Sequence, residues 1–212
     1  MSPHPLADVV ALDIDGNLAD YHGAFTEFAE KWTGRKMPDP THINPGLPLY
    51  KHLHMSRENY RQAKLAFRQG GWKRWMFCYP HSRELTVHIR KKGVQVWICT
   101  SRPYLRLDNV DPDTRHWLRR NRIQYDGVVF GEDKYKQLAR IVGIDRILMV
   151  VDDLPEQIDK ANALGLLTVI RNQPYNKLYY GAKYRAFNNY DTQEIFDDCR
   201  RRTNGDHNRK SG

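Results

Sequence analysis

Residues 9–17 constrain the fold of this chain more than any other segment, because an apolar run ends abruptly in two carboxylates. The run Val9-Val10-Ala11-Leu12 is followed by Asp13, Asp15 and Gly16. Side chains of a strand alternate with a period of two, so Asp13 and Asp15 should leave the strand end on the same side. Close carboxylates repel unless a hard cation such as Mg²⁺ neutralises them. The pattern indicates either a metal site or an Asp-Gly turn after a buried strand.

Two later apolar runs also end in polar clusters. Residues 94–99 lead into Thr100-Ser101-Arg102-Pro103, and residues 147–151 lead into Asp152-Asp153. In a parallel α/β sheet, ligands bind outside the carboxyl ends of the strands. We therefore expect the three clusters to meet at one edge of a sheet.

From residue 82 onward, helical patterns alternate with short apolar runs, which predicts an α/β fold with a parallel sheet and helices on both faces. The expected strands are 8–13, 94–99, 127–130, 147–151 and 167–170. The expected helices are about 22–33, 56–69, 82–91, 113–121, 133–141, 156–164 and 192–202.

The segment between the first two strands is far longer than the dozen or so residues that a simple crossover needs. Proline and glycine clusters interrupt it, which predicts a helical subdomain with hinges near residues 20 and 80. We expect residues 1–20 and 81–202 to form the core domain and residues 21–80 to form a helical cap. A decorative insertion is the alternative. Residues 203–212 are polar and are expected to be disordered.

The positive charge of the chain is concentrated in and just after this insertion. Residues 21–92 carry 14 Lys and Arg against 5 Asp and Glu, whereas the rest of the chain is balanced. The bias favours the attraction of small anionic substrates, although a solvated basic face would have the same composition. Tyr21, Trp72 and Trp75 lie among these charges and are candidates to stack on a nucleobase. The alternative is that aromatic residues form the core of the cap.

Composition excludes several other classes of protein. No apolar run approaches the roughly 20 residues that span a bilayer, and the first residues lack the apolar core of a signal peptide. The three cysteines are widely spaced and odd in number, which disfavours a disulfide framework and a zinc site. We expect a soluble, cytoplasmic protein without membrane contact. The sequence does not indicate its oligomeric state.

Four polar segments, taken in order, resemble the motifs of the haloacid dehalogenase (HAD) superfamily of phosphohydrolases. Asp13 and Asp15 are similar to motif I, Thr100 to motif II, Lys134 to motif III and Asp152-Asp153 to motif IV. The resemblance covers roughly residues 8 to 172. It implies a Rossmann-like core with a helical cap after the first strand.

The resemblance also implies the chemistry of the site. Asp13 would be the nucleophile and form an aspartyl phosphate, while Asp15 would be the general acid and base. Thr100 would bind the transferring phosphoryl oxygens, with Ser101 the less favoured hydroxyl, and Lys134 would add positive charge. Mg²⁺ would be held by Asp13, the carbonyl oxygen of Asp15, and the pair Asp152 and Asp153. Of that pair, Asp153 is the preferred ligand, and a charged turn at a helix N-terminus is the alternative.

Within the superfamily, the chain is most similar to the 5'(3')-deoxyribonucleotidases of bacteria and phages. The likeness rests on the segments Asp13-Ile14-Asp15-Gly16, Leu18-Ala19-Asp20-Tyr21, Ile98-Cys99-Thr100-Ser101, Glu132-Asp133-Lys134, Asp152-Asp153-Leu154-Pro155 and Asn172-Gln173-Pro174-Tyr175-Asn176. It implies a phosphatase that acts on nucleoside monophosphates.

Arg102 departs from that pattern and resembles the arginine after motif II in the 3'-phosphatase domain of phage polynucleotide kinase. It could contact a substrate phosphate or carboxylate, or form a salt bridge inside its loop. Nucleic-acid ends are therefore an alternative substrate. A non-catalytic nucleic-acid-binding module is a third reading, which the presence of all the motif carboxylates disfavours.

Overall fold

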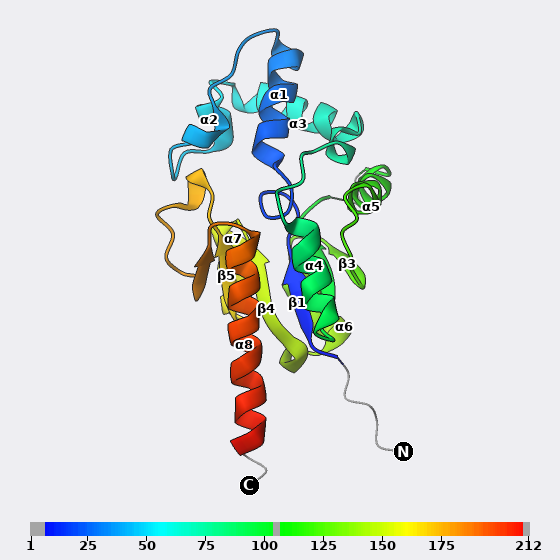
Figure 1. The fold of residues 1–212 in the computed structure, drawn as a ribbon. Coiled ribbons are helices and arrows are strands. Elements are labelled where there is room, and N and C mark those ends of the chain that lie inside the picture. The colour runs from blue at the N-terminus through cyan, green and yellow to red at the C-terminus, as the bar shows by residue number, and fades with distance from the viewer. Residues whose placement is uncertain (1–6, 104–106, 210–212) are drawn as a thin grey trace.

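The computed structural model describes residues 7–103 and 107–209, and it shows a six-stranded parallel sheet with helices on both faces (Figure 1). The sheet order is β3-β2-β1-β4-β5-β6, and every neighbouring pair is parallel. The strands are β1 (Val9–Leu12), β2 (Gln95–Thr100), β3 (Gly127–Phe130), β4 (Ile147–Asp152), β5 (Thr168–Arg171) and β6 (Tyr184–Ala186). The expected fold class is confirmed.

The alternation of side chains along β1 divides the core into two layers. Val10 and Leu12 face the layer formed with α4 (Ser82–Lys91), α5 (Val110–Arg120) and α8 (Asn189–Arg209). Val9 and Ala11 face the layer formed with α6 (Lys134–Val142) and α7 (Pro155–Asn162). All four residues are fully buried, because a central parallel strand is covered on both faces. This burial fixes the carboxyl end of β1, where Asp13 follows.

The insertion between β1 and β2 forms a separate layer beyond the carboxyl end of β1 (Figure 1). Its elements are α1 (Tyr21–Thr33), η1 (Pro40–His42), α2 (Leu49–His52), α3 (Arg57–Gln69) and η2 (Trp72–Arg74), which we call the inserted helices. Phe25, Phe28 and Phe67 pack edge to face between α1 and α3, with ring centroids 5.4 and 5.5 Å apart for the contacts of Phe67. These aromatic residues hold the inserted helices together, and they belong to the same buried apolar cluster as Val10 and Leu12 of β1.

Helix α1 is capped at both of its ends. Asp20 precedes the helix, and its Oδ1 accepts a hydrogen bond of 2.9 Å from the backbone N–H of Gly23. Gly34 ends the helix with φ +71°, a conformation that glycine adopts readily.

The expected helices and strands match the structure closely up to the last helix, apart from several short elements and the end of that helix. The short elements α2 and β6 were not expected, and α8 continues to Arg209, beyond the predicted end near residue 202. Strand β6 has only three residues and is defined by its pairing with β5, which a local pattern does not reveal. Once a helix has formed, each further residue adds a hydrogen bond, so polar residues can extend it. The rest of the predicted disordered tail, residues 210–212, lies outside the described residues.

The remaining short elements, η3 (Ile144–Arg146) and η4 (Pro174–Asn176), are single turns that lead into β4 and follow β5. Among the described residues, no helix combines the length and the apolar character needed to cross a bilayer.

Trp117 provides a test of how α5 is attached to the rest of the fold. Its side chain is fully buried, and its indole N–H donates a hydrogen bond of 2.9 Å to the carbonyl oxygen of Met76. We expect Trp117→Ala to lower the free energy of unfolding by about 3–5 kcal/mol, through a cavity and an unpaired carbonyl. Trp75→Ala is the control, because Trp75 is 60% exposed, and its cost should stay below about 1 kcal/mol. Equal losses in urea denaturation would contradict this assignment.

Candidate active site

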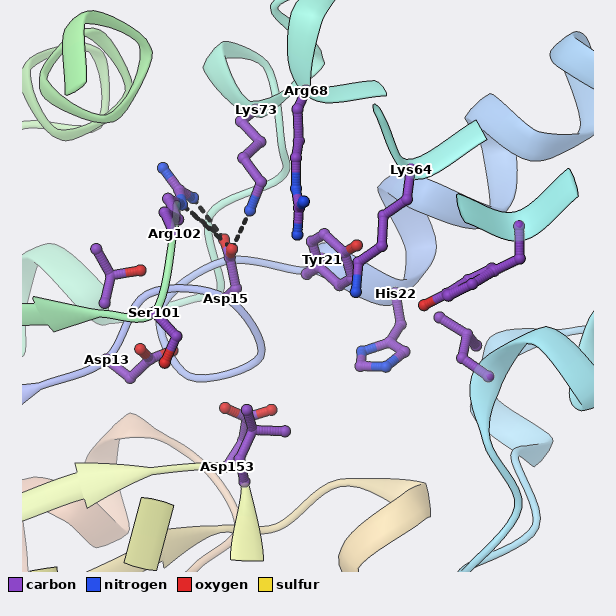
Figure 2. A pocket seen from close by; sticks show the side chains of 14 residues that line it. Asp13, Asp15, Tyr21, His22, Lys64, Arg68, Lys73, Ser101, Arg102 and Asp153 are labelled. Carbon is purple, nitrogen blue, oxygen red and sulfur yellow. Dashed lines mark hydrogen bonds and ion pairs between the residues drawn. The ribbon is translucent and has the colours of Figure 1, made fainter. Parts of the chain in front are cut away.

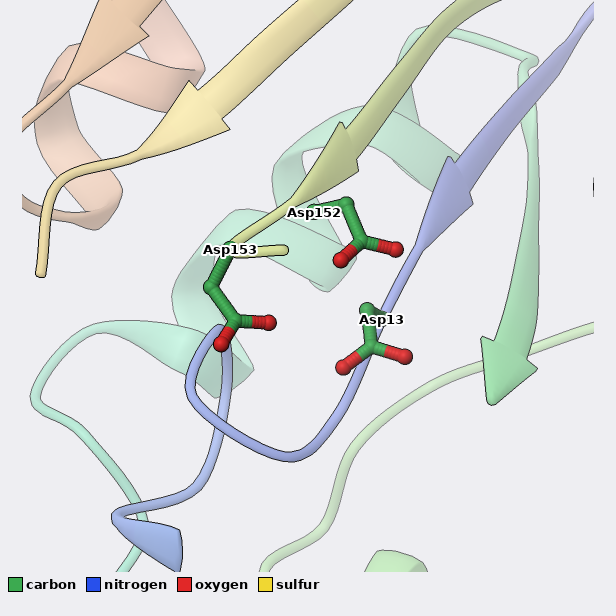
Figure 3. Close-up of side chains that lie close together, drawn as sticks. All are labelled: Asp13, Asp152 and Asp153. Atoms are coloured by element: carbon green, nitrogen blue, oxygen red, sulfur yellow. The ribbon is translucent and has the colours of Figure 1, made fainter. Parts of the chain in front are cut away.

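Three buried carboxylates meet where β1 and β4 end (Figure 3). Asp13 follows β1, Asp152 is the last residue of β4, and Asp153 comes next in the chain. The backbone N–H of Asp13 donates to the carbonyl oxygen of Val151 at 3.0 Å, which ties the two strand ends together. One oxygen from each carboxylate lies within 4.8 Å of the others. Parallel pairing of the two strands thus creates a compact acidic group.

Lys134, at the start of α6, is the one ammonium group that this acidic cluster contacts in the described part of the chain. Its Nζ lies 2.5 Å from Oδ1 of Asp13 and 2.6 Å from Oδ2 of Asp152, and the side chain is fully buried. Burial would lower the pKa of Lys134, but the two carboxylates outweigh it and raise the pKa above its usual value. Lys134 therefore stays charged. It neutralises one of the three carboxylates.

Asp153 has a buried carboxylate oxygen that is not hydrogen-bonded within the described residues. Its Oδ2 accepts a hydrogen bond from the hydroxyl of Tyr175, whereas its Oδ1 is buried without a hydrogen-bond partner among the described residues. Burial raises the pKa of Asp153 well above its ordinary value, and Asp152 and Asp13 raise it further. If all three carboxylates are ionised, one ammonium leaves an excess of two negative charges, and the raised pKa of Asp153 reflects the cost of that excess. An all-oxygen site with this excess fits a hard divalent cation.

Gly16 allows the loop after β1 to pass close to this cluster. Its φ is +92°, and a Cβ at this position would stand 2.2 Å from Oδ2 of Asp153. Any larger residue would therefore be strained and would displace a carboxylate of the cluster.

Asp15 lies apart from the three-carboxylate cluster and pairs with two cations. Arg102 Nη2 lies 2.5 Å from Oδ1 of Asp15, and its Nε lies 3.2 Å from both oxygens. Lys73, from η2, also donates to Oδ2 of Asp15. Burial would raise the pKa of Asp15, but Arg102 and then Lys73 outweigh it and hold that pKa well below its usual range. Burial in turn lowers the pKa of Lys73 to about 7.

A cavity of about 260 Å³ lies between the inserted helices and the carboxyl ends of the strands (Figure 2). Polar and ionisable side chains from both parts line it, among them Asp13, Asp15, Tyr21, His22, Lys64, Arg68, Lys73, Thr100, Ser101, Arg102 and Asp153. The hydroxyls of Ser101 and Tyr21 are buried and unpartnered within the described chain. Burial lowers the pKa of His22 to about 4, so its ring is neutral near pH 7.

Most of the site residues expected from the sequence lie in or next to this cavity. Asp13, Asp15, Tyr21, Thr100, Ser101, Arg102 and Asp153 line it, while Lys134 and Asp152 contact each other at its base, where Lys134 also holds Asp13. Arg102 forms an ion pair, but with a carboxylate of the loop after β1 and not inside its own loop as considered from the sequence. Its partner is Asp15, and its Nη1 donates to the hydroxyl of Thr114 at 2.9 Å.

The expectation that Trp72 and Trp75 line the site is not met. Both line a different cavity, of about 620 Å³, together with α1 residues such as Glu27. Trp72 packs on Phe28, with ring centroids 5.2 Å apart, and Trp75 lies against His116. Successive residues of a tight turn point in different directions, so in η2 Lys73 reaches Asp15 of the site, whereas Arg74 pairs with Asp113. Their assignment as base contacts is therefore corrected.

Three cations of the cavity were not singled out from the sequence: Lys64, Arg68 and Lys73. The net charge of the insertion pointed to the segment but not to these residues. A finer signal was available on α3, since Tyr60, Lys64 and Arg68 are spaced by four residues and must share one face of the helix. The position of Lys73 depends on the turn after Gly71, which has φ +72°.

Comparison with known proteins places the chain among phosphatases. The profile of the family described as "5' nucleotidase, deoxy (Pyrimidine), cytosolic type C protein" matches residues 7–201. A protein of Chlorobaculum tepidum, provisionally named as a 5'(3')-deoxyribonucleotidase, is 23% identical over 172 residues, which cover 80% of this chain and 81% of that protein.

Solved structures show the same fold. A predicted phosphatase from Clostridium acetobutylicum superposes with a TM-score of 0.67 at 15% identity, covering 91% of this chain and 99% of that one. A HAD-superfamily hydrolase from Geobacter sulfurreducens superposes with a TM-score of 0.59 at 19% identity, with the same two coverages.

Removing Lys134 should expose how strongly the carboxylates depend on it. Lys134→Met leaves Asp13 and Asp152 buried without their cation, which should lower the free energy of unfolding by about 3–5 kcal/mol in EDTA. Lys136→Met, on the exposed side of the same helix, is the matched control and should change stability little. Urea titrations that give the same midpoint for both variants would disprove the central role of this ion pair.

Proposed function

This chain belongs to the family of cytosolic-type 5'-deoxynucleotidases, which are HAD-type phosphoric monoester hydrolases, and from that premise we propose that it hydrolyses nucleoside monophosphates. We further propose that it requires Mg²⁺ and forms an aspartyl phosphate on Asp13. The observation that carries this proposal is the position of Asp13, which lines the cavity while Lys134 and two more carboxylates surround it.

Asp13 is suited to attack phosphorus because its two oxygens have different surroundings. Lys134 holds Oδ1, and Oδ2 makes no hydrogen bond within the described residues. Attack by Oδ2 would break the bond between phosphorus and the nucleoside oxygen and leave an acyl phosphate on Asp13. Water would then release inorganic phosphate. The buried Lys134 would stabilise the carboxylate that leaves in this second step.

Asp13, Asp152 and Asp153 are the side chains that would hold Mg²⁺. When bound, the ion would supply the positive charge that lets a phosphate approach these carboxylates. The unpartnered Oδ1 of Asp153 and the excess of two negative charges support this assignment. The hydroxyls of Thr100 and Ser101, which line the same cavity, would donate hydrogen bonds to the phosphoryl oxygens.

Asp15 would act as the general acid and base. Paired with Arg102 and Lys73, it is ionised near neutral pH and is therefore suited to accept a proton from the attacking water. To protonate the leaving oxygen, it must first gain a proton, which requires that one of its two ion pairs loosens. Lys73 belongs to the inserted helices, so this pair is the one that movement of those helices would break.

The cavity favours a small substrate over the end of a nucleic acid. Its volume of about 260 Å³ is near the lower end for ligand pockets, and side chains of α3 and η2 cover it. Tyr21, the neutral ring of His22, Tyr60 and Leu49 provide an aromatic and apolar side for a nucleoside. Arg102, whose resemblance suggested nucleic-acid ends as a substrate, is already paired with Asp15.

Replacing the nucleophile tests the proposed mechanism. Asp13→Asn keeps the size of the side chain but cannot attack phosphorus, so release of phosphate from thymidine 5'-monophosphate should fall at least about a thousandfold. Label from a ³²P-phosphorylated substrate, trapped on the quenched wild-type protein, should disappear. Asp145→Asn, at an exposed position, should behave as wild type. Substantial turnover by Asp13→Asn would rule out the covalent mechanism.

Metal removal tests the role of the acidic cluster. EDTA should abolish phosphate release and Mg²⁺ should restore it, whereas Zn²⁺ should substitute poorly for these all-oxygen ligands. Mg²⁺ should also raise the melting temperature of the wild-type protein, because it neutralises the excess negative charge. Asp153→Asn should remove most of that increase. Full activity in a metal-free preparation would contradict the assignment.

A further inference from the structure

Helix α3 presents three side chains to the cavity at intervals of four residues. Tyr60, Lys64 and Arg68 lie one helical turn apart along the same face, and all three line the cavity. On another face of this helix, Ala63 and Phe67 are buried against the inserted helices. The packing of Phe67 on α1 therefore fixes the direction in which Lys64 and Arg68 point.

Lys64 and Arg68 differ from the other cations of the site because neither forms an ion pair within residues 7–103 and 107–209. Arg102 and Lys73 pair with Asp15, and Lys134 pairs with Asp13 and Asp152. Lys64 Nζ lies 5.4 Å from the ring centroid of Tyr60 and is attracted by Asp15 and Glu132 only at longer range.

Arg68 carries a polar atom with no partner. Its Nε is buried, and no acceptor within the described residues contacts it. Burial lowers the pKa of Lys64, and the positive charge of Arg68 lowers it further. Burying two neighbouring cations without an acidic side chain to pair with them raises the free energy of the folded protein. Binding of an anionic ligand would offset this increase.

Lys64 and Arg68 enter the cavity from the inserted helices, whereas Asp13 and Asp153 lie at the strand ends. Figure 2 shows Lys64 beside Tyr21 and above His22, and Arg68 between Lys64 and Lys73, with Asp13, Ser101 and Asp153 on the opposite side of the view. All of these residues line one cavity, so a single ligand could contact both groups.

We propose that the preferred substrate carries a second phosphate, bound by Lys64 and Arg68, and is therefore a nucleoside 3',5'-bisphosphate. This inference rests on the proposed nucleotidase activity and narrows its substrate class. Two cations match the charge of a phosphate monoester, which is close to −2 at neutral pH, better than that of a carboxylate. The guanidinium of Arg68 can also bind two phosphate oxygens at once. Because these two cations come from the inserted helices, opposite the strand ends that carry Asp13 and Asp153, their position favours a phosphate separated from the first by a sugar over the second phosphate of a 5'-diphosphate.

The kinetic test compares thymidine 5'-monophosphate, thymidine 5'-diphosphate and thymidine 3',5'-bisphosphate with Mg²⁺. We expect kcat/KM for the 3',5'-bisphosphate to exceed that of the other two at least about tenfold, because each charge-assisted hydrogen bond contributes to binding. In Lys64→Met/Arg68→Met this ratio should fall toward one. Arg68→Lys, which keeps the charge, should retain part of it. Arg61→Met, on the exposed side of α3, removes one positive charge and should keep the full ratio.

A binding test separates recognition from turnover. In the Asp13→Asn background, calorimetric titration should show that the 3',5'-bisphosphate binds at least about tenfold more tightly than the monophosphate. The preference should vanish in Asp13→Asn/Lys64→Met/Arg68→Met. Thermal melting of each variant verifies that it is folded. If the variant with Lys64→Met and Arg68→Met does not fold, the milder substitutions Lys64→Gln and Arg68→Lys replace them.

The outcomes distinguish this inference from the function on which it rests. Equal kcat/KM values for the monophosphate and the 3',5'-bisphosphate, with good turnover of both, would overturn the second phosphate site and leave the nucleotidase proposal intact. A preference that survives removal of both cations would also overturn it. Turnover of an aryl phosphate but of no nucleotide would overturn the nucleotidase proposal.

Discussion

The buried ammonium of Lys134, between Asp13 and Asp152, is the interaction on which the site depends. It joins the ends of β1 and β4 to the start of α6, and none of the three side chains could be buried at acceptable cost without the others. It also leaves the cluster two positive charges short. That shortage suits the cluster to a divalent cation. The pairing with Lys134 also places Asp13, the nucleophile of the proposed reaction, beside a fixed positive charge.

A second ion-paired group links the core to the inserted helices. Asp15 follows the first strand, Arg102 follows the second, and Lys73 comes from η2, so the pairing of Asp15 depends on where the inserted helices lie. The same side chain is the proposed acid and base. In the proposed reaction, proton transfer would therefore be coupled to the position of the inserted helices through this one carboxylate, and the strength of its two ion pairs would determine how readily it takes up a proton.

The charges of the cavity are arranged unevenly, and this arrangement bears on specificity. Lys73, Arg102 and Lys134 each have an acidic partner, whereas Lys64 and Arg68 have none in the described chain. The basic composition of the insertion thus has two consequences. Part of it is used internally, to hold Asp15, and part remains available for a ligand. The net charge of the insertion does not distinguish the paired from the unpaired cations, because the pairing depends on whether an acidic side chain lies close to each cation.

The sequence by itself determined the α/β class, the positions of most helices and strands, and the meeting of Asp13, Thr100 and Asp152-Asp153 at one edge, because period-two alternation and apolar runs are local properties. Its placement of Trp72 and Trp75 at the site was wrong, since the direction of a side chain in the turn of η2 depends on packing against Phe28 and His116. Only the tertiary structure decided that Arg102 pairs with Asp15, that Lys73 joins them, and that Lys64 and Arg68 remain unpaired. These contacts join residues far apart in the chain, so their energies depend on the distances and burial that folding creates.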